Sequence, residues 1–405
     1  MPLNPEWLEV VRRSMDLPGA PADHLVVVAM SGGVDSTTTA GLLSAAGYRV
    51  AGVTLRLHDA EQEAAMACAP RGRTCCAGRD ILDARLAADR LGIPHYVLDM
   101  ADLFRRAVIE RFCDSYVAGE TPVPCVDCNR VVKFDALLTH ARMLGASALV
   151  TGHYAESRRL SPDDSRRGLF TPADMARDQS YFLHATTQAQ LDFLRFPLAA
   201  LTKAAVREAA AALGLDLVSD KPASQDICFV PDGDYRRVVL RHRPEAARPG
   251  PILHVDGRKL GEHGGIIGYT IGQRRGLGLA VGEPLYVVAL DAVRNAVIVG
   301  PREALKVPAL VVRGVNWLGD APLPAGEQAA LGLWVRIRST RPPRPARVWQ
   351  EAGTVHVRFD EPEEGVAPGQ ACVFYTGPGP GQRVLGGGTI ARTRAPVGVF
   401  AMERT

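Results

Sequence analysis

The chain has 405 residues, more than the roughly 250–300 at which one hydrophobic core stops growing, so we expect two or three domains. Hydrophobic residues make up 47% and charged residues 22% of it, and this ordinary balance excludes a mostly disordered chain. The net charge of +3 excludes nothing about nucleic-acid binding, because binding depends on where the positive charge lies.

The N-terminal stretch "MPLNPEWLEVVRRSMDLPGAP" lacks the apolar core and cleavage site of a secretory signal. No run reaches the roughly 18 uninterrupted apolar residues that a membrane span needs. The sequence therefore predicts a cytoplasmic protein without membrane contact. Its eight cysteines would then lie in a reducing compartment, where thiols more often do chemistry or bind metal than form permanent disulfides.

Four apolar, β-branched runs predict strands in the first half of the chain, at 24–30, 48–57, 95–100 and 147–153. Because these runs are continuous rather than alternating, they favour a parallel sheet covered on both faces. The Ala- and Leu-rich stretch 77–92 predicts a crossover helix. We therefore expect an α/β domain with a doubly wound parallel sheet, whose ligand lies at the carboxyl ends of its strands.

The stretch "SGGVDS" (31–36) follows the first of these strands and predicts a phosphate-binding loop. Gly32 and Gly33 would let backbone amides approach a phosphate, and the helix that follows adds its N-terminal amides. The loop lacks the Lys of G-x-x-x-x-G-K-[ST] and is not G-x-G-x-x-G. It resembles the pyrophosphate loop of the ATP pyrophosphatases, which have an adenine nucleotide α-hydrolase-like fold. That resemblance implies ATP cleavage to AMP and pyrophosphate, with Asp35 acting through Mg²⁺.

Two further motifs carry cysteines: "TPVPCVDCNRVVKF" (121–134) with Cys125 and Cys128, and "SQDICFVPDGDY" (224–235) with Cys228. Asn129 is expected to open a helix, which would place Cys128 at a helix N-terminus and lower its pKa. Three other cysteines are expected to be small buried residues: Cys68, Cys113 and Cys372.

Together with "GHYAE" (152–156), "ARDQSYFL" (176–183), "GIIGYTIGQRRGLG" (265–278) and "PGQACVFY" (368–375), these motifs make the chain resemble the bacterial tRNA-specific 2-thiouridylase family along nearly its whole length. The resemblance implies adenylation of O2 of the wobble uridine of tRNA and its replacement by sulfur. Relay proteins fed by a cysteine desulfurase would supply that sulfur. Cys128 would be the nucleophile, Cys228 would receive the persulfide, and one turnover would end in a Cys128–Cys228 disulfide.

The same resemblance implies contacts for further residues. ATP contacts are expected at Ala29, Met30, Ser31, Gly32, Gly33, Val34, Asp35, Ser36, Leu55 and Gly152. Contacts with tRNA are expected at Val123, Pro124, Cys125, His153, Arg177, Asp178, Gln179, Arg338, Ser339 and Gln370. For His153, a structural hydrogen-bonding histidine is an equal expectation.

The chain departs from this family at one position, since many relatives have Asp three residues before the nucleophile and this chain has Cys125. Either Asp127 or Asp178 takes the acid–base role, or Cys125, Cys128 and Cys228 form a three-thiolate site. Such a site could hold a [4Fe–4S] cluster, or zinc. We favour the persulfide route and keep the cluster as the alternative.

After about residue 222 the sequence changes to short β-branched runs punctuated by Gly and Pro, which predict two small barrels. We expect a catalytic domain at 1–222, a central β-rich domain at 223–302 and a tRNA-binding barrel at 303–405. The stretch 335–349 holds five arginines and no acidic residue. By itself it fits a solvated basic edge equally well, but next to an enzyme that acts on tRNA, as the resemblance implies, it favours phosphate contacts. Gln273, Arg274 and Arg275 are secondary candidates, and we expect a monomer bound to one tRNA.

Two other functions stay open at this point. A different ATP pyrophosphatase, such as an amide-forming synthetase, would be indifferent to Cys128→Ser and Cys228→Ser. A redox or iron–sulfur protein with a vestigial nucleotide loop would bind iron and release no pyrophosphate in response to tRNA. Neither alternative explains the arginine-rich stretch.

Overall fold

The computed structural model describes residues 3–58, 77–215, 227–230, 233–279 and 282–394, so Cys68 lies outside the described residues. The chain forms two compact units. The first contains Met1–Val108, Cys125–Gly233 and Gly379–Leu385, and the second contains Ile109–Pro124, Asp234–Pro378 and Gly386–Thr405. The domain boundaries at 222 and 302 stay predictions.

A five-stranded sheet of order β3-β2-β1-β4-β7 is the centre of the first unit, and its neighbouring strands pair in parallel. Its strands are β1 (Leu25–Ala29), β2 (Arg49–Arg56), β3 (His95–Asp99), β4 (Ala148–Thr151) and β7 (Leu194–Arg195). The doubly wound parallel sheet and all four predicted strands are confirmed. The two-residue strand β7 carries too little pattern to be recognised in the sequence.

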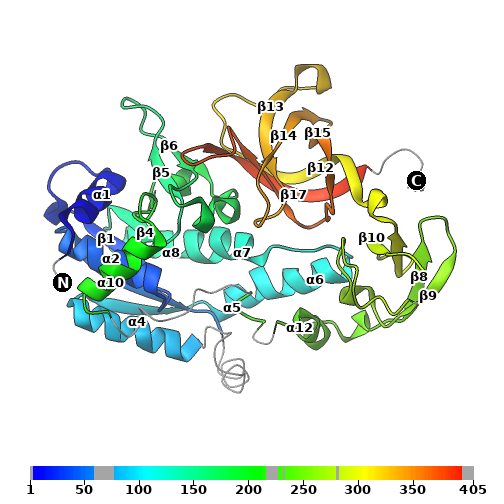
Figure 1. Cartoon of the computed structure of the whole chain (residues 1–405). Helices are drawn as coiled ribbons and strands as arrows, with labels where there is room; N and C mark the ends of the chain where they lie inside the picture. The colour runs from blue at the N-terminus through cyan, green and yellow to red at the C-terminus, as the bar shows by residue number, and fades with distance from the viewer. Residues whose placement is uncertain (1–2, 59–76, 216–226, 231–232, 280–281, 395–405) are drawn as a thin grey trace. The chain divides into compact units, whose positions relative to one another are not determined.

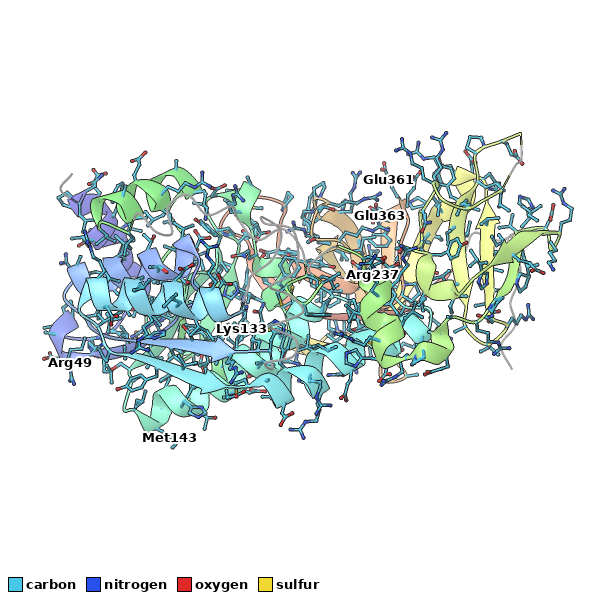
Figure 2. The ribbon with its side chains drawn as sticks, turned by 90° about the horizontal axis from the view of Figure 1, so that it is seen from below. Arg49, Lys133, Met143, Arg237, Glu361 and Glu363 are labelled. Atoms are coloured by element: carbon cyan, nitrogen blue, oxygen red, sulfur yellow. The ribbon has the colours of Figure 1, made fainter. Side chains whose placement is uncertain are left out.

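Helices cover this sheet and bury its core. They are α1 (Pro5–Met15), α2 (Val34–Ala45), α4 (Ala77–Leu91), α8 (Leu137–Met143) and α10 (Lys203–Ala212), and the predicted crossover helix is α4. Helix α2 packs against α1, α4 and α10. Figure 2 shows α8, where Met143 is labelled, on the opposite side of the sheet from α4. Val28, Leu42 and Val150 are fully buried between these layers, each stabilising the fold by about 1.5–3 kcal/mol.

The remaining elements of this unit are short. They are η1 (Pro21–Asp23), α5 (Ala101–Phe104), η3 (Cys128–Ala136), β5 (Glu156–Arg159), β6 (Arg167–Phe170), η4 (Met175–Arg177), η5 (Ser180–Leu183) and α9 (Gln188–Leu191). Two elements span the division between the units, η2 (Arg105–Glu110) and α7 (Pro124–Asp127). Both η2 and η3 are π-helical.

The second unit contains two β structures and the helices α6 (Arg111–Val117) and α12 (Tyr235–His242). Its smaller sheet has the order β10-β11-β8-β9 and is open at both ends among the described residues. Its strands are β8 (Gly250–His254), β9 (Lys259–His263), β10 (Tyr286–Asp291) and β11 (Ala296–Gly300). This part is therefore β-rich as predicted, although its described strands do not close into a barrel.

The C-terminal strands form a closed six-stranded barrel of order β12-β15-β14-β13-β16-β17, because β12 also pairs with β17 (Figure 1). The strands are β12 (Lys306–Trp317), β13 (Leu331–Arg336), β14 (Arg344–Glu351), β15 (Thr354–Glu364), β16 (Ala371–Tyr375) and β17 (Arg383–Arg394). The predicted barrel is confirmed here. Among the described residues, no helix has the length and apolar character that crossing a membrane requires.

Candidate active site

The loop after β1 leaves the start of α2 open to an anion. Gly33 is the N-cap residue of α2, in an extended conformation, and being a glycine it makes no side-chain capping hydrogen bond. The amide of Ser31 donates to Oγ of Ser36 at 3.0 Å, and the two hydroxyl oxygens lie 3.2 Å apart. Since the first amides of a helix have no partner within the helix, this geometry suits a phosphate, as the sequence predicts.

Two glycines allow the loop to pack closely against its neighbours. Gly32 has φ +70°, and a Cβ there would lie 2.3 Å from the carbonyl oxygen of Asp80. A Cβ on Gly152, just after β4, would lie 2.8 Å from the amide nitrogen of Ser36. Gly152 is therefore required for packing against the loop, whether or not it also contacts a nucleotide.

The carboxylate of Asp35 has two partners from distant parts of the same unit. Nζ of Lys203 donates to Oδ1 of Asp35 at 2.5 Å, across 168 positions of sequence, and the hydroxyl of Tyr154 donates to the same oxygen at 3.0 Å. Burial, followed by the charge of Asp35, raises the pKa of Tyr154, which keeps it a donor. The loop thus has a lysine beside it, although its own sequence contains none.

Lys203 was missed at the level of sequence, yet its position carries a signal. It is the first residue of α10, directly after the N-cap Thr202, whose hydroxyl accepts from the amide of Ala205. The positive end of the helix dipole favours acidic side chains there and disfavours a lysine. A cation at this position indicates a compensating anion nearby, and here that anion is Asp35.

The segment expected to contact tRNA connects to the same network. Gln179 accepts from the amide of Tyr154 through its side chain at 2.9 Å and donates its own amide to the Tyr154 carbonyl at 3.0 Å. Asp178 accepts from the amide of Ser180 at 2.9 Å, whereas Arg177 is exposed. Gln179 therefore positions Tyr154, and Arg177 is the most accessible of these three candidates.

His153 has a structural environment. Its Nδ1 lies 2.7 Å from the hydroxyl of Thr151, and its ring packs edge-on against Phe134 and Phe196. Burial lowers the pKa of His153 to about 3, so the ring is neutral at physiological pH. These contacts favour the structural histidine over a charged contact with phosphate.

The other residues expected to contact ATP differ in what they can offer. Met30 and Val34 have buried side chains in the core, so only their backbone groups could face a nucleotide. The Met30 carbonyl already accepts from the hydroxyl of Thr54 at 2.8 Å. Leu55, near the end of β2, is half-buried and can offer an apolar surface.

The helix that carries Cys125 and Cys128 begins earlier than predicted. It starts at Pro124 in α7 and continues directly into η3 at Cys128, so Cys128 lies in its second turn rather than at its N-terminus. Proline is favourable in a first turn because its missing N–H would have no helical partner there. The expectation that Asn129 opens the helix is wrong.

The predicted low pKa of Cys128 is wrong for the same reason. Cys128 is only 6% exposed, and burial raises its pKa, with Lys133 acting in the opposite direction. Lys133 is on the same helical segment and is labelled in Figure 2. Cys125 is exposed at the start of the helix, and Asp127 pairs with Arg130 at 3.5 Å.

Cys228 is half-buried, and its neighbour Phe229 packs edge-on against Phe104 with ring centroids 5.8 Å apart. In the part of the chain that the structure describes, no disulfide is present, and no group of three or more His, Cys, Asp or Glu side chains is arranged to hold a metal ion. Cys113 and Cys372 are fully buried, as predicted.

Comparison with known proteins places the chain. Family models match residues 24–232 (tRNA methyl transferase HUP domain), 236–301 (tRNA methyl transferase PRC-barrel domain) and 307–390 (aminomethyltransferase β-barrel domain). The chain is 60% identical over 378 residues to the tRNA-specific 2-thiouridylase MnmA of Azorhizobium caulinodans, covering 93% of this chain and 95% of that protein. It is 57% identical over 384 residues to the protein of the same name from a Methylobacterium, covering 94% and 98%. The chain belongs to the tRNA-specific 2-thiouridylase family.

The arginine-rich stretch of this family member is largely engaged within the barrel. Nη1 of Arg341 lies 2.5 Å from Oε1 of Glu363, and Nε of Arg344 lies 3.7 Å from its Oε2. Glu363 is on β15 and is labelled in Figure 2. The guanidinium of Arg336 donates to the carbonyl of Ser339, and that of Arg338 donates to the carbonyl of Gly365. These arginines stabilise the barrel, so their charge is only partly available to a ligand.

Of the other residues expected to contact tRNA in this unit, some are engaged in internal contacts and some are exposed. The side-chain Nε2 of Gln370 donates to the carbonyl of Thr121 at 2.9 Å, while Pro124 is buried and Val123 half-buried. Arg274 and Arg275, the secondary candidates, are exposed, and among the described residues neither guanidinium has an ion-pair or hydrogen-bond partner. Gln273 is used to shape their loop, since its side chain donates to the carbonyl of Arg275 at 3.0 Å.

Proposed function

We propose that this chain is a tRNA-specific 2-thiouridylase, a sulfurtransferase that uses ATP to adenylate O2 of the wobble uridine of tRNA and then replaces that oxygen with sulfur. The observation that carries the proposal is the open N-terminus of α2 with Lys203 beside Asp35, in the unit that also holds Cys128 and Cys228. The family membership agrees with it.

The phosphates of ATP would lie against the first amides of α2 and the hydroxyls of Ser31 and Ser36. Lys203 would balance the negative charge that develops on the leaving pyrophosphate. Asp35 is a suitable ligand for the Mg²⁺ ion that accompanies ATP phosphates. Before Mg²⁺ and ATP bind, Lys203 would hold the carboxylate of Asp35 in place. Gly152 and Leu55 would border the nucleoside.

Sulfur transfer would follow adenylation. The thiolate of Cys128 attacks the inner sulfur of a persulfide on Cys228, the persulfide S–S bond breaks, and hydrosulfide leaves. Hydrosulfide displaces AMP from C2 of the uridine, giving 2-thiouridine and a Cys128–Cys228 disulfide. Since burial raises the pKa of Cys128, a nearby base must take its proton, and Asp178 and Asp127 are the candidates.

We further propose that the substrate is a tRNA with a wobble uridine, held partly through Arg274, Arg275 and Arg177, and that the protein acts as a monomer in the cytoplasm. Relay proteins fed by a cysteine desulfurase would load Cys228. The iron–sulfur route through Cys125, Cys128 and Cys228 is the competing mechanism.

The test is mass-spectrometric detection of 2-thiouridine in unmodified tRNA after incubation with Mg-ATP and a persulfide donor, using metal-free protein prepared without air. We expect product with the wild type and with Cys113→Ala, and none with Cys128→Ser, which should still bind tRNA. Normal product from Cys128→Ser would refute the assigned nucleophile. Activity that appears only after reconstitution with iron and sulfide would favour the cluster route.

A further inference from the structure

Cys125 and Cys128 form a C-x-x-C pair at the start of one continuous helix. Cys125 lies in the first turn, in α7, and Cys128 begins η3. Side chains three residues apart on a helix are neighbours, with Cβ atoms about 5–6 Å apart. A disulfide needs Cβ atoms about 3.5–4.5 Å apart, so a small adjustment in the first turn would join them. Such pairs at helix starts are typical of dithiol redox sites.

The two thiols differ in their access to solvent. The residue Cys125 is exposed although burial raises the pKa of its thiol, whereas Cys128 is only 6% exposed. Their three-residue spacing on one continuous helix places them close together, and Cys125 is among the groups that raise the pKa of Cys128, after burial. An external reductant can therefore reach the sulfur of Cys125 far more easily than that of Cys128, and a disulfide at Cys128 would be reduced slowly by direct attack.

Resting on the function proposed above, we propose that Cys125 is the resolving thiol of the enzyme. After sulfur transfer, the thiolate of Cys125 attacks Sγ of Cys128, the Cys128–Cys228 bond breaks, and Cys228 leaves as a thiolate that takes up a proton. The new Cys125–Cys128 disulfide includes the exposed residue Cys125, and a dithiol reductant reduces it with two electrons. The exchange itself needs no oxidant, because the disulfide is only moved.

This role gives a reason for a thiol at position 125. Cys228 is freed at once to accept the next persulfide, while reduction takes place at the exposed end of the helix. Only Cys128 would belong to both disulfides, one with a thiol on its own helix and one with the half-buried Cys228 of the same unit.

The experiment is a single turnover without reductant, followed by peptide mapping under non-reducing conditions. Persulfide-loaded full-length protein is mixed with unmodified tRNA and Mg-ATP, trapped with an alkylating agent at successive times, and digested. Cys125 and Cys128 lie on one tryptic peptide together with Cys113, and Cys228 lies on another. The mapping therefore uses Cys113→Ala protein, in which an internal disulfide of the first peptide joins Cys125 to Cys128 and differs in mass from the linked pair of peptides. We expect the linked pair of peptides first and the internal disulfide as the final species.

The matched variants are Cys125→Ser and Cys125→Asp. Both should stop with the Cys128–Cys228 disulfide, and with a bulky protein dithiol as reductant their yield should stay near one 2-thiouridine per enzyme while the wild type continues. A wild-type protein that makes 2-thiouridine but keeps the Cys128–Cys228 disulfide, or variants that continue like the wild type, would overturn the resolving role alone. No 2-thiouridine from the wild type would overturn the proposed function as well.

Discussion

The phosphate loop of the first unit and the arginine-rich stretch of the barrel both gather charge, and they use it in opposite ways. At the loop, Lys203 is brought from 168 residues away to a carboxylate that borders open helix amides. In the barrel, Glu363 on β15 pairs with Arg341 and Arg344. The stretch that holds these arginines contains no acidic residue, so its sequence alone suggested that they were unpaired. Lys203 thus adds a positive charge beside the phosphate loop, whereas Glu363 pairs with arginines of the barrel and reduces the positive charge available to a ligand.

The difference shows that the charge of a local stretch is a poor guide to the charge that a ligand meets. The phosphate loop contains no cation, yet one lies beside its aspartate. The stretch at 335–349 contains five arginines, yet Arg336 and Arg338 donate to backbone carbonyls and Arg341 to Glu363. The accessible positive charge of the second unit is better represented by Arg274 and Arg275.

The largest effect is expected from Lys203→Met. Removing the cation should lower tRNA-dependent pyrophosphate release by about 10²–10³-fold, the usual cost of one group that stabilises developing charge. Calorimetric titration with inorganic pyrophosphate and Mg²⁺ should show weaker binding. Lys306→Met, which removes an exposed lysine at the start of β12, is the matched control and should change neither quantity.

A second pair of variants separates binding from simple neutralisation of Asp35. Lys203→Arg keeps the charge and should retain part of the pyrophosphate affinity. If Lys203 served only to neutralise Asp35, then Asp35→Asn combined with Lys203→Met would restore the pyrophosphate affinity measured without Mg²⁺, the ion that Asp35 is proposed to hold. We expect no restoration, and recovery in the double variant would show that the lysine is a structural partner only.

The next effect concerns Arg274 and Arg275. Replacing both with Ala should weaken tRNA binding several-fold and reduce the slope of log affinity against log salt by about 1 for each phosphate that is no longer neutralised. Filter binding at several salt concentrations measures this slope. An unchanged slope would mean that the exposed loop is not part of the tRNA surface.

The pH response of stability tests whether burial sets the charge of two histidines in the first unit. The pKa of His153 is lowered to about 3 and that of His184 to about 4, both by burial. Below the unfolded pKa of about 6.5, the unfolded chain binds protons that the folded chain does not, so stability should fall by up to about 1.4 kcal/mol per pH unit per histidine. Urea unfolding from neutral pH down to about pH 5 should show this slope, and His153→Gln should reduce it.

The sheet, the phosphate loop and the barrel could be predicted from the sequence because each depends on a local pattern of residues. Continuous β-branched runs marked β1, β2, β3 and β4, and "SGGVDS" marked the start of α2. Contacts between distant segments could not be found in this way. Lys203 and Glu363 act on partners that only the fold brings near, and the buried second turn that holds Cys128 reverses the pKa expected for a helix start.

The smallest effect, Arg341→Ala, examines the barrel side of the comparison. Arg341 is partly exposed, so losing its pair with Glu363 should cost only about 0.5–1 kcal/mol of unfolding free energy. The affinity for tRNA and its salt slope should stay the same, because this guanidinium already has an internal partner.

Glu363→Gln gives the complementary variant: it removes the carboxylate that pairs with Arg341 and Arg344, so tRNA binding should become slightly tighter at low salt while stability falls. Weaker tRNA binding by Arg341→Ala, with the slope reduced by about 1, would instead mean that tRNA displaces Glu363 from this arginine. The difference between the loop and the barrel would then lie in which partner each gives up when the ligand arrives.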